Sequence, residues 1–496
     1  MSRLTGLVVN FLLKEYLYCV KLYAMIHACY FRGASIMVKL TQFDEYMAHL
    51  CEGLGYATRH RSLIDYCSGL MLPIARKSVE PLAAHADPRH VPAKHQALHH
   101  FVANAPWSDR VLLDRVRSYV EPHLGLHRGT FWIVDDTGHA KCGTHSVGVA
   151  RQYCGQLGKI DNCQVAVSLS LSTDKASVPM DYQLYLSKEW AKDRQRRRAT
   201  GVPDSVRFAT KPQIALAQIR AAQQRGVTPG IVLADAAYGT NTAFREGVQA
   251  LGLSYAVSVI SSTSVWAPGS APLPPAPYTG RGRVPTRARR APGHQPLSVK
   301  DVALGLELAV WHTVAWREGT NQTLRSRFAR VRVRAAHRHN RRAGADDEQW
   351  LLIEWPKGQA EPTRYWLSTL PLSINLKDLV NTAKMRWRIE HDYHELKQEF
   401  GLSHYEGRGW TGFHHHAAFA WPPTAFSPRS DCNRAPKKTP LDYKRLPYPK
   451  VTNLAAAGRT QRHIPDSIPT LRYLVATALA QRLPRCPCCS SIRMQV

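Results

Sequence analysis

Apolar positions divide the chain into a helical first part and a strand-rich middle. Between residues 37 and 121 they recur at the three- and four-residue steps of a helix, as at Phe43, Met47 and Leu50. A further strong helical pattern covers residues 108–120. We therefore predict an N-terminal helical domain, which serves either to contact DNA or only to pack.

Two short apolar runs in the middle of the chain each end in acidic residues and a glycine. The first, at 130–138, contains Asp135 and Asp136, and the second, at 230–239, contains Asp235. Apolar runs of this length predict buried strands, so both should deliver a carboxylate to the edge of a sheet. The alternative is that each aspartate simply ends its strand, as aspartates before turns often do.

The elements around these two runs follow an order that indicates the fold. Alternation predicts strands at 164–172 and 180–186, helical spacing predicts a helix at 211–225, and residues 255–260 predict a last strand after another helix. Three strands, a helix, a strand, a helix and a strand are the order of a ribonuclease-H-like mixed sheet, an α/β fold. The first and fourth strands of that fold end side by side, so the two acidic ends should meet.

A late helix, at 386–400, separates into an apolar side and a charged side. The apolar side is a stripe at steps of four, three and four residues: Ile389, Tyr393, Leu396 and Phe400. Arg386, Glu390 and Lys397 lie on an adjacent face, with the carboxylate between two cations. Such a face predicts either a site for a metal ion and a phosphate or an ion-paired surface.

The segment between the second and third acidic positions is too long to be a loop in a compact core. Residues 262–298 are rich in Pro, Gly and Arg, which predicts a basic linker. Four stretches then alternate like strands: 309–316, 329–335, 350–355 and 363–370. We therefore predict a β-rich insertion domain. Three basic runs are either phosphate contacts or solvated charged faces: 194–198, 281–290 and 325–342.

The charge balance points to the class of partner. The chain has 66 Lys and Arg against 37 Asp and Glu, a net charge of +29, which suits a polyanion such as nucleic acid. Its eleven cysteines are odd in number and scattered, which is typical of a reducing compartment rather than of a disulfide framework. These features favour a cytoplasmic protein that binds nucleic acid.

The two ends of the chain depart from the rest. Lys14, Glu15 and Lys21 interrupt the apolar N-terminus, so we expect no membrane span there and interpret residues 1–36 as a non-native or disordered extension. Prolines break the segment after Ala418, and a basic helix follows it. The predicted domains are the extension (1–36), the helical domain (37–121) and the first part of the catalytic core (122–261). They continue with the linker and insertion domain (262–372), the part of the core with the third-acid helix (373–418) and an irregular C-terminal segment (419–496).

The spacing of Arg386, Glu390 and Lys397 resembles a known signature. The chain is similar to bacterial insertion-sequence transposases of the DDE, cut-and-paste type, whose third acid lies in a Tyr-x2-Arg-x3-Glu-x6-Lys motif. The tyrosine position of that motif is Ala383 here. The resemblance also rests on the VDDTG and LADAAYG blocks around the acids and on the KEW and WREGT stretches.

This resemblance implies a catalytic chemistry and a set of partners. Asp136, Asp235 and Glu390 are the expected metal ligands, for two Mg²⁺ or Mn²⁺ ions, with Asp135 as the second choice for the first acid. Arg386 and Lys397 are expected to hold the phosphates that flank the scissile bond. The implied partners are double-stranded DNA, as terminal inverted repeats and as target, and a second copy of the chain.

Other residues leave alternatives open. Trp316 and Trp366 stack on an extruded base or pack in a core, and the run His414–His416 lies near DNA or at the surface rather than on a metal. Two functions remain: an active metal-dependent transposase, or a catalytically silent DNA-binding relative. A general ribonuclease-H-like nuclease is a third and weaker interpretation.

Overall fold

The computed structural model divides the described chain into two compact units. It describes residues 33–126, 129–174, 176–318, 323–336, 347–420 and 468–483. The first unit contains residues 1–119, 395–406 and 419–496, and the second contains residues 120–394 and 407–418. Most of the expected N-terminal extension and nearly all of the proline-rich C-terminal segment lie outside the described residues. The six predicted domain boundaries therefore stay predictions.

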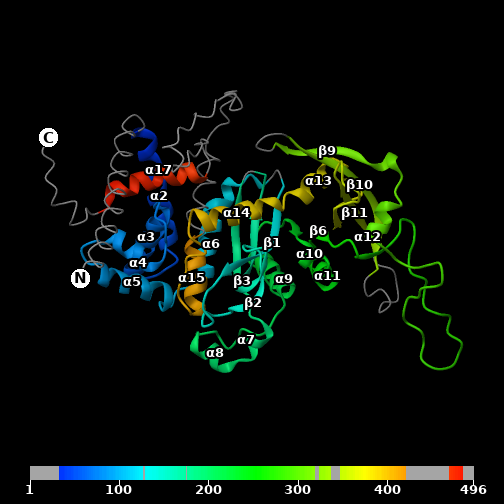
Figure 1. Cartoon of the computed structure of the whole chain (residues 1–496), viewed down its shortest axis with the longest axis horizontal. Helices are drawn as coiled ribbons and strands as arrows, with labels where there is room; N and C mark the ends of the chain where they lie inside the picture. The colour runs from blue at the N-terminus through cyan, green and yellow to red at the C-terminus, as the bar shows by residue number, and fades with distance from the viewer. Residues whose placement is uncertain are drawn as a thin grey trace, which may run out of the picture. The chain divides into compact units, whose positions relative to one another are not determined.

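The first unit is helical, as its apolar spacing predicted. Its helices are α2 (Gly33–Cys51), α3 (Ala57–Met71), α4 (Val79–Ala86), α5 (Val91–Ala103), α6 (Asp109–Val120) and α17 (Ile468–Arg482). Helix α17 packs along α2 and α3 (Figure 1), and Arg482 donates to the Asp44 carboxylate at 2.8 Å. The late basic helix of the chain thus joins the earliest described helix in one core.

Aromatic rings hold the centre of this unit together. The Phe419 ring lies 4.8 Å from Tyr66, 5.3 Å from Phe101 and 4.9 Å from Trp107, measured between ring centroids. Trp107 also donates its indole N–H to the carbonyl of Phe101 at 2.9 Å. Buried rings at these separations contribute through both area and ring geometry. The unit is therefore a packed helical domain, and its contact with DNA stays a prediction.

The second unit is built on one mixed sheet. The strands are β1 (Phe131–Ala140), β2 (Ala150–Cys154), β3 (Lys159–Ser172), β4 (Ser177–Leu184), β5 (Ile231–Ala234), β6 (Tyr255–Val259), β7 (Ser264–Trp266), β8 (Leu297–Ser298), β9 (His312–Glu318), β10 (Thr323–Ala335), β11 (Glu348–Trp355) and β12 (Arg364–Ser368). Their order is β2-β3-β1-β5-β6-β12-β11-β10-β7-β8, with β4 beside β3 and β9 beside β10. The core strands β4, β3, β1, β5 and β6 confirm the predicted ribonuclease-H-like α/β class.

Strand β1 runs further than the sequence predicted. We expected it to end at its acidic residues, but it continues to Ala140 because β3 pairs with it antiparallel along its whole length. Its parallel neighbour β5 pairs only with Phe131–Ile133 and ends at Ala234. Asp135 and Asp136 therefore lie inside β1, just beyond the point where β5 stops. The two acidic residues therefore lie beside the C-terminal end of β5, and not at the end of β1.

Helices connect the strands of this unit and follow its last strand. They are α7 (Lys188–Lys192), α8 (Arg194–Ala199), α9 (Lys211–Gln224), α10 (Ala236–Gly239), α11 (Thr242–Ala250), α12 (Val299–Leu304), α13 (Leu376–Lys384), α14 (Trp387–Gln398) and α15 (Trp410–Ala420), with short turns at Glu121–His123 and Leu308–Val310. Helix α9 starts with a capping box between Thr210 and Gln213 and packs on β3. Gly239 ends α10 against β6, where a Cβ atom would lie 2.0 Å from the Ser258 carbonyl oxygen. Only glycine allows this approach.

The predicted insertion strands are present, and they extend the core sheet. Strand β12 pairs antiparallel with β6, with Trp366 opposite Ser258, so β9–β12 continue the same sheet instead of starting a new one. A buried cluster closes one face of this extension: Val314, Phe328, Trp350, Leu352, Trp366, Leu370, Leu379, Val380 and Ala383. The cluster joins the insertion strands to α13, which leads into the helix that carries Glu390.

The three consecutive histidines were predicted to lie near DNA or at the surface, and the surface placement is wrong. All three are buried in α15. The His414 ring donates from Nδ1 to the Trp410 carbonyl at 2.9 Å, and its Nε2 accepts from the Leu184 backbone N–H at 3.2 Å. These partners favour a neutral ring that joins α15 to β4. In the described part of the chain, no helix combines the length and the apolar character needed to cross a membrane.

Candidate active site

The second acidic strand end forms a helix cap. Strand β5 stops at Ala234, and the Asp235 carboxylate accepts the backbone N–H of Ala237 at 2.9 Å, which caps α10. Burial raises the pKa of Asp235 and the charge of Asp136 adds to this, against the opposing effect of the Arg386 guanidinium. Asp235 is thus held rigidly beside other charged groups.

The two acids of β1 point to opposite faces of the sheet. Neighbouring side chains alternate along a strand, and the partners of these two differ accordingly. Asp135 is buried and accepts a hydrogen bond from Arg386 Nη1 at 3.1 Å. Asp136 is partly exposed and forms an ion pair with Lys211, the first residue of α9. Each acid of the pair therefore has its own cation, Lys211 from α9 and Arg386 from the turn between α13 and α14.

Burial sets the electrostatics of this cluster. It raises the pKa of Asp135 to about 7; Arg386 opposes the shift, whereas the nearby charges of Asp235 and Asp136 add to it. The acids from β1 and β5 therefore interact electrostatically although they are far apart in the sequence. A group of carboxylates with perturbed pKa values in one place is typical of a functional site.

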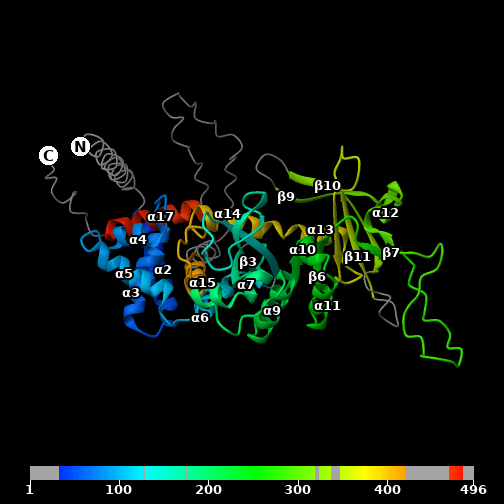
Figure 2. The same cartoon turned by 60° about the horizontal axis from the view of Figure 1, so that its bottom comes forward.

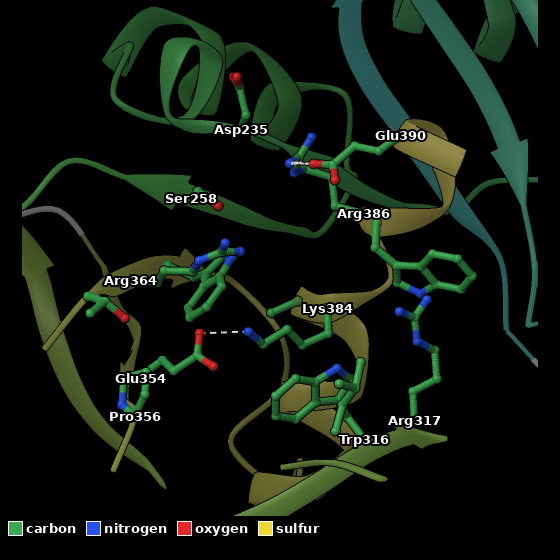
Figure 3. Close-up of a pocket in the computed structure, with 15 residues that line it drawn as sticks. Asp235, Ser258, Trp316, Arg317, Glu354, Pro356, Arg364, Lys384, Arg386 and Glu390 are labelled. Carbon is green, nitrogen blue, oxygen red and sulfur yellow. Dashed lines mark hydrogen bonds and ion pairs between the residues drawn. The ribbon is translucent and has the colours of Figure 1, made fainter. Parts of the chain in front are cut away.

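Arg386 connects the third acid to this cluster. It lies between α13 and α14, and its guanidinium donates to Asp135. It also donates to Glu390, on the first turn of α14 (Figure 3). Burial lowers the pKa of Arg386, but the carboxylates of Asp135 and Glu390 raise it by more, so its pKa lies above the usual value. The Glu390 side chain remains 60% exposed. Arg386 therefore joins a buried acid, Asp135, to an acid that faces solvent, Glu390.

Tyr393 fixes α14 on the sheet. Its hydroxyl forms a hydrogen bond with Ser168, which lies opposite Asp135 in the β1–β3 register. Because Tyr393 is three residues after Glu390, this contact sets the rotation of the helix that carries the acid. Lys397 lies on the last turn of α14, in the portion of the helix that belongs to the first unit. Its role stays a prediction.

A cavity of about 520 Å³ opens beside Asp235, Arg386 and Glu390. Figure 3 shows Trp316, Arg317, Glu354 and Lys384 around it. The further lining residues are Ser258, Leu324, Pro356, Thr363, Arg364, Trp366, Ala383 and Trp387. The space beside the acids is thus lined by aromatic rings and cations from the insertion strands and α13.

A buried ion pair forms part of the wall of this cavity. Lys384 donates to Glu354 at 2.6 Å, and its ammonium lies 4.5 Å from the Trp316 ring centroid and 5.2 Å from that of Trp366. Trp366 is only 4% exposed, so it is a core residue in this structure. Ala383, at the tyrosine position of the motif, is buried in the same cluster.

The donor atoms of the acids fit a hard divalent cation. They are carboxylate oxygens without a thiol or an imidazole among them, the set that Mg²⁺ and Mn²⁺ prefer. Within the described residues, however, no three such side chains are grouped closely enough to hold an ion. Arg386 lies between Asp135 and Glu390, and Lys211 holds Asp136. Metal binding would have to displace these cations.

Two parts of the site had no signal in the sequence. Lys211 comes from a helix start that helical spacing predicts, but nothing local pairs it with Asp136. The Glu354–Lys384 pair joins a strand to a helix across 30 positions. A buried strand position occupied by glutamate was the single available hint, since glutamate is almost never buried without a partner.

Comparison with known proteins agrees with this geometry. The DDE superfamily endonuclease profile matches residues 49–323, more than half of the chain and both acidic strands. The chain belongs to the DDE superfamily of endonucleases. Members of this superfamily generally use divalent metal ions. A relative described as a probable transposase for insertion sequence element IS701, from Microchaete diplosiphon, is 33% identical over 168 residues. That match covers 34% of this chain and 41% of the relative.

Proposed function

We propose that this DDE endonuclease is a transposase. It binds the terminal inverted repeats of an insertion sequence, cuts DNA strands and joins the resulting 3′ hydroxyl to target DNA. The main support is the electrostatic cluster in which Asp136 interacts with Asp235. In the same cluster, the neighbouring acid Asp135 shares the Arg386 guanidinium with Glu390. The likeness to a probable insertion-sequence transposase agrees with this proposal.

In the proposed reaction, Asp136, Asp235 and Glu390 are the metal ligands, and Asp135 is the alternative first acid. Two bound divalent ions would activate the attacking water and stabilise the leaving oxygen. Arg386 moves from its acids to the phosphates beside the scissile bond, and Lys397 holds a further phosphate. Two copies of the chain act together, one at each end of the element.

A substitution at Asp235 tests this proposal. Asn keeps an oxygen that caps α10 but removes the carboxylate charge, so Asp235→Asn should fold normally. With a labelled terminal-repeat duplex and Mg²⁺, we expect cleavage to fall by more than about a hundredfold, because even partners behind a metal ligand contribute 10- to 100-fold. Binding of the duplex without Mg²⁺ should change little.

Asp193→Asn is the matched control. Asp193 caps α8 through the backbone N–H of Arg196 at 2.9 Å, the same role that Asp235 has on α10, but outside the acidic cluster. The control should cleave like the native chain. Equal cleavage by the Asp235 variant would contradict the proposal. Binding without cleavage by the native chain would instead indicate the catalytically silent relative.

A further inference from the structure

A basic arm, residues 267–296, leaves the sheet between β7 and β8. Both views show it as a long loop that extends away from the strands (Figures 1 and 2). It contains five arginines and no acidic residue. Eight prolines restrict its backbone. The arm therefore presents a concentrated positive charge on a stiff loop.

The base of the arm is fastened by short-range contacts. Leu273 and Arg289 exchange two backbone hydrogen bonds, at 3.0 and 2.8 Å. The Arg289 side chain donates to the Pro274 carbonyl at 3.0 Å, so this arginine is used inside the arm. His294 forms a hydrogen bond with the Ala271 carbonyl at 2.6 Å, and its ring packs on Trp266 at the end of β7. These contacts fix where the arm leaves the sheet.

The tip of the arm points its charge to solvent. Arg281, Arg283 and Arg287 are exposed, and they form no ion pair with any residue in the described ranges. Gly280 and Gly282 flank Arg281 with φ angles of 80° and 78°, a left-handed conformation that only glycine adopts easily. The glycines allow the backbone turns at the tip, where Arg281 and Arg283 are exposed to solvent.

The chemistry of the tip favours a phosphate backbone over a protein partner. Arginine forks match phosphate oxygens, and the absence of acidic residues removes internal competition. A protein interface needs an apolar centre, whereas the tip offers only Tyr278 and Val284. Three exposed arginines at the tip of one loop are instead typical of a contact that neutralises several phosphates and carries no base recognition.

We propose that the basic arm is a DNA clamp in which Arg281, Arg283 and Arg287 contact the phosphates of duplex DNA without reading its sequence. This inference rests on the proposed function, because that function supplies duplex DNA as the partner. It adds a surface far along the chain from the acidic cluster that holds DNA while the strands are cut.

Salt dependence tests the clamp directly. The Kd of the full-length chain for a labelled duplex of arbitrary sequence is measured without Mg²⁺ between 50 and 200 mM NaCl. Each neutralised phosphate adds about 0.9 to the slope of log Kd against log salt. The variant R281Q/R283Q/R287Q should therefore lose about 2 to 3 from that slope. The variant R281K/R283K/R287K keeps the charge and should keep most of the slope.

A control variant separates the arm from overall charge. R207Q/R220Q/K357Q removes three exposed charges from other parts of the same unit, and its slope should change by less than about 1. An equal fall of the slope in both neutralised variants would overturn the clamp. An unchanged slope in the arm variant would overturn it as well. Because this assay contains no Mg²⁺, cleavage by the native chain is scored separately and reports on the proposed function alone.

Discussion

Two ion pairs near the end of α13 differ in how they use their cation. Lys384 is enclosed between aromatic rings and gives its charge to Glu354 alone, with both side chains largely buried. Arg386, two residues later, shares its guanidinium between buried Asp135 and exposed Glu390. The Lys384–Glu354 pair, here called the closed pair, links α13 to β11. A shared cation such as Arg386 can instead release one of its two acids to bind a ligand. We therefore interpret the Lys384–Glu354 pair as structural and propose that the pairs of Arg386 belong to the functional site.

The closed pair should show the largest effect on stability. In Glu354→Gln, Lys384 keeps a buried charge without its counter-ion, and breaking such a pair typically costs about 3–5 kcal/mol of unfolding free energy. Chemical denaturation of the native and variant chains measures this difference. The exposed pair Lys300–Glu361, at 2.7 Å in the same unit, is the control. Glu361→Gln should cost less than about 1 kcal/mol, and equal losses would remove the distinction.

The shared cation should affect activity more than stability. Arg386→Lys keeps a positive charge but loses the planar fork that reaches both acids. We expect Mg²⁺-dependent cleavage to fall about a hundredfold, which corresponds to about 2.7 kcal/mol, with a smaller change in unfolding. Arg388→Lys is the matched control, because Arg388 lies two residues later, on α14, and its guanidinium donates to the Asp174 carbonyl at 2.6 Å. A loss of stability without a loss of cleavage would make Arg386 a structural residue like Lys384.

The buried acid of the shared pair should show its effect as a pH dependence of stability. The folded pKa of Asp135 is about 7, above its unfolded value, so the folded chain binds more protons across this window. Stability should therefore fall as pH rises from about 4 to 7, by about 1 kcal/mol between pH 5 and pH 6. Asp135→Asn should lose this contribution. An unchanged pH profile of the unfolding free energy in the variant would show that folding does not raise the pKa of Asp135.

Local sequence was sufficient for the elements but not for their lengths. The spacing of Ile389, Tyr393 and Leu396 predicted α14 and the face that it buries, because helical periodicity is a property of one segment. The predicted end of β1 was wrong, because the extension of this strand past Asp136 depends on its pairing with β3. The buried position of His414 likewise depends on β4, which supplies the backbone N–H that its ring accepts.

The sequence by itself determined the fold class and the strongly basic character of the chain, because periodicity and composition are local or summed quantities. The three candidate acids stay a prediction, which rests on strand ends, helical spacing and the family resemblance. The tertiary structure alone decided that Asp135 faces Arg386 while Asp136 faces Lys211, and that Glu354 closes a pair with Lys384. Such partners meet only when strands and helices pack across long sequence separations, so no local pattern specifies them.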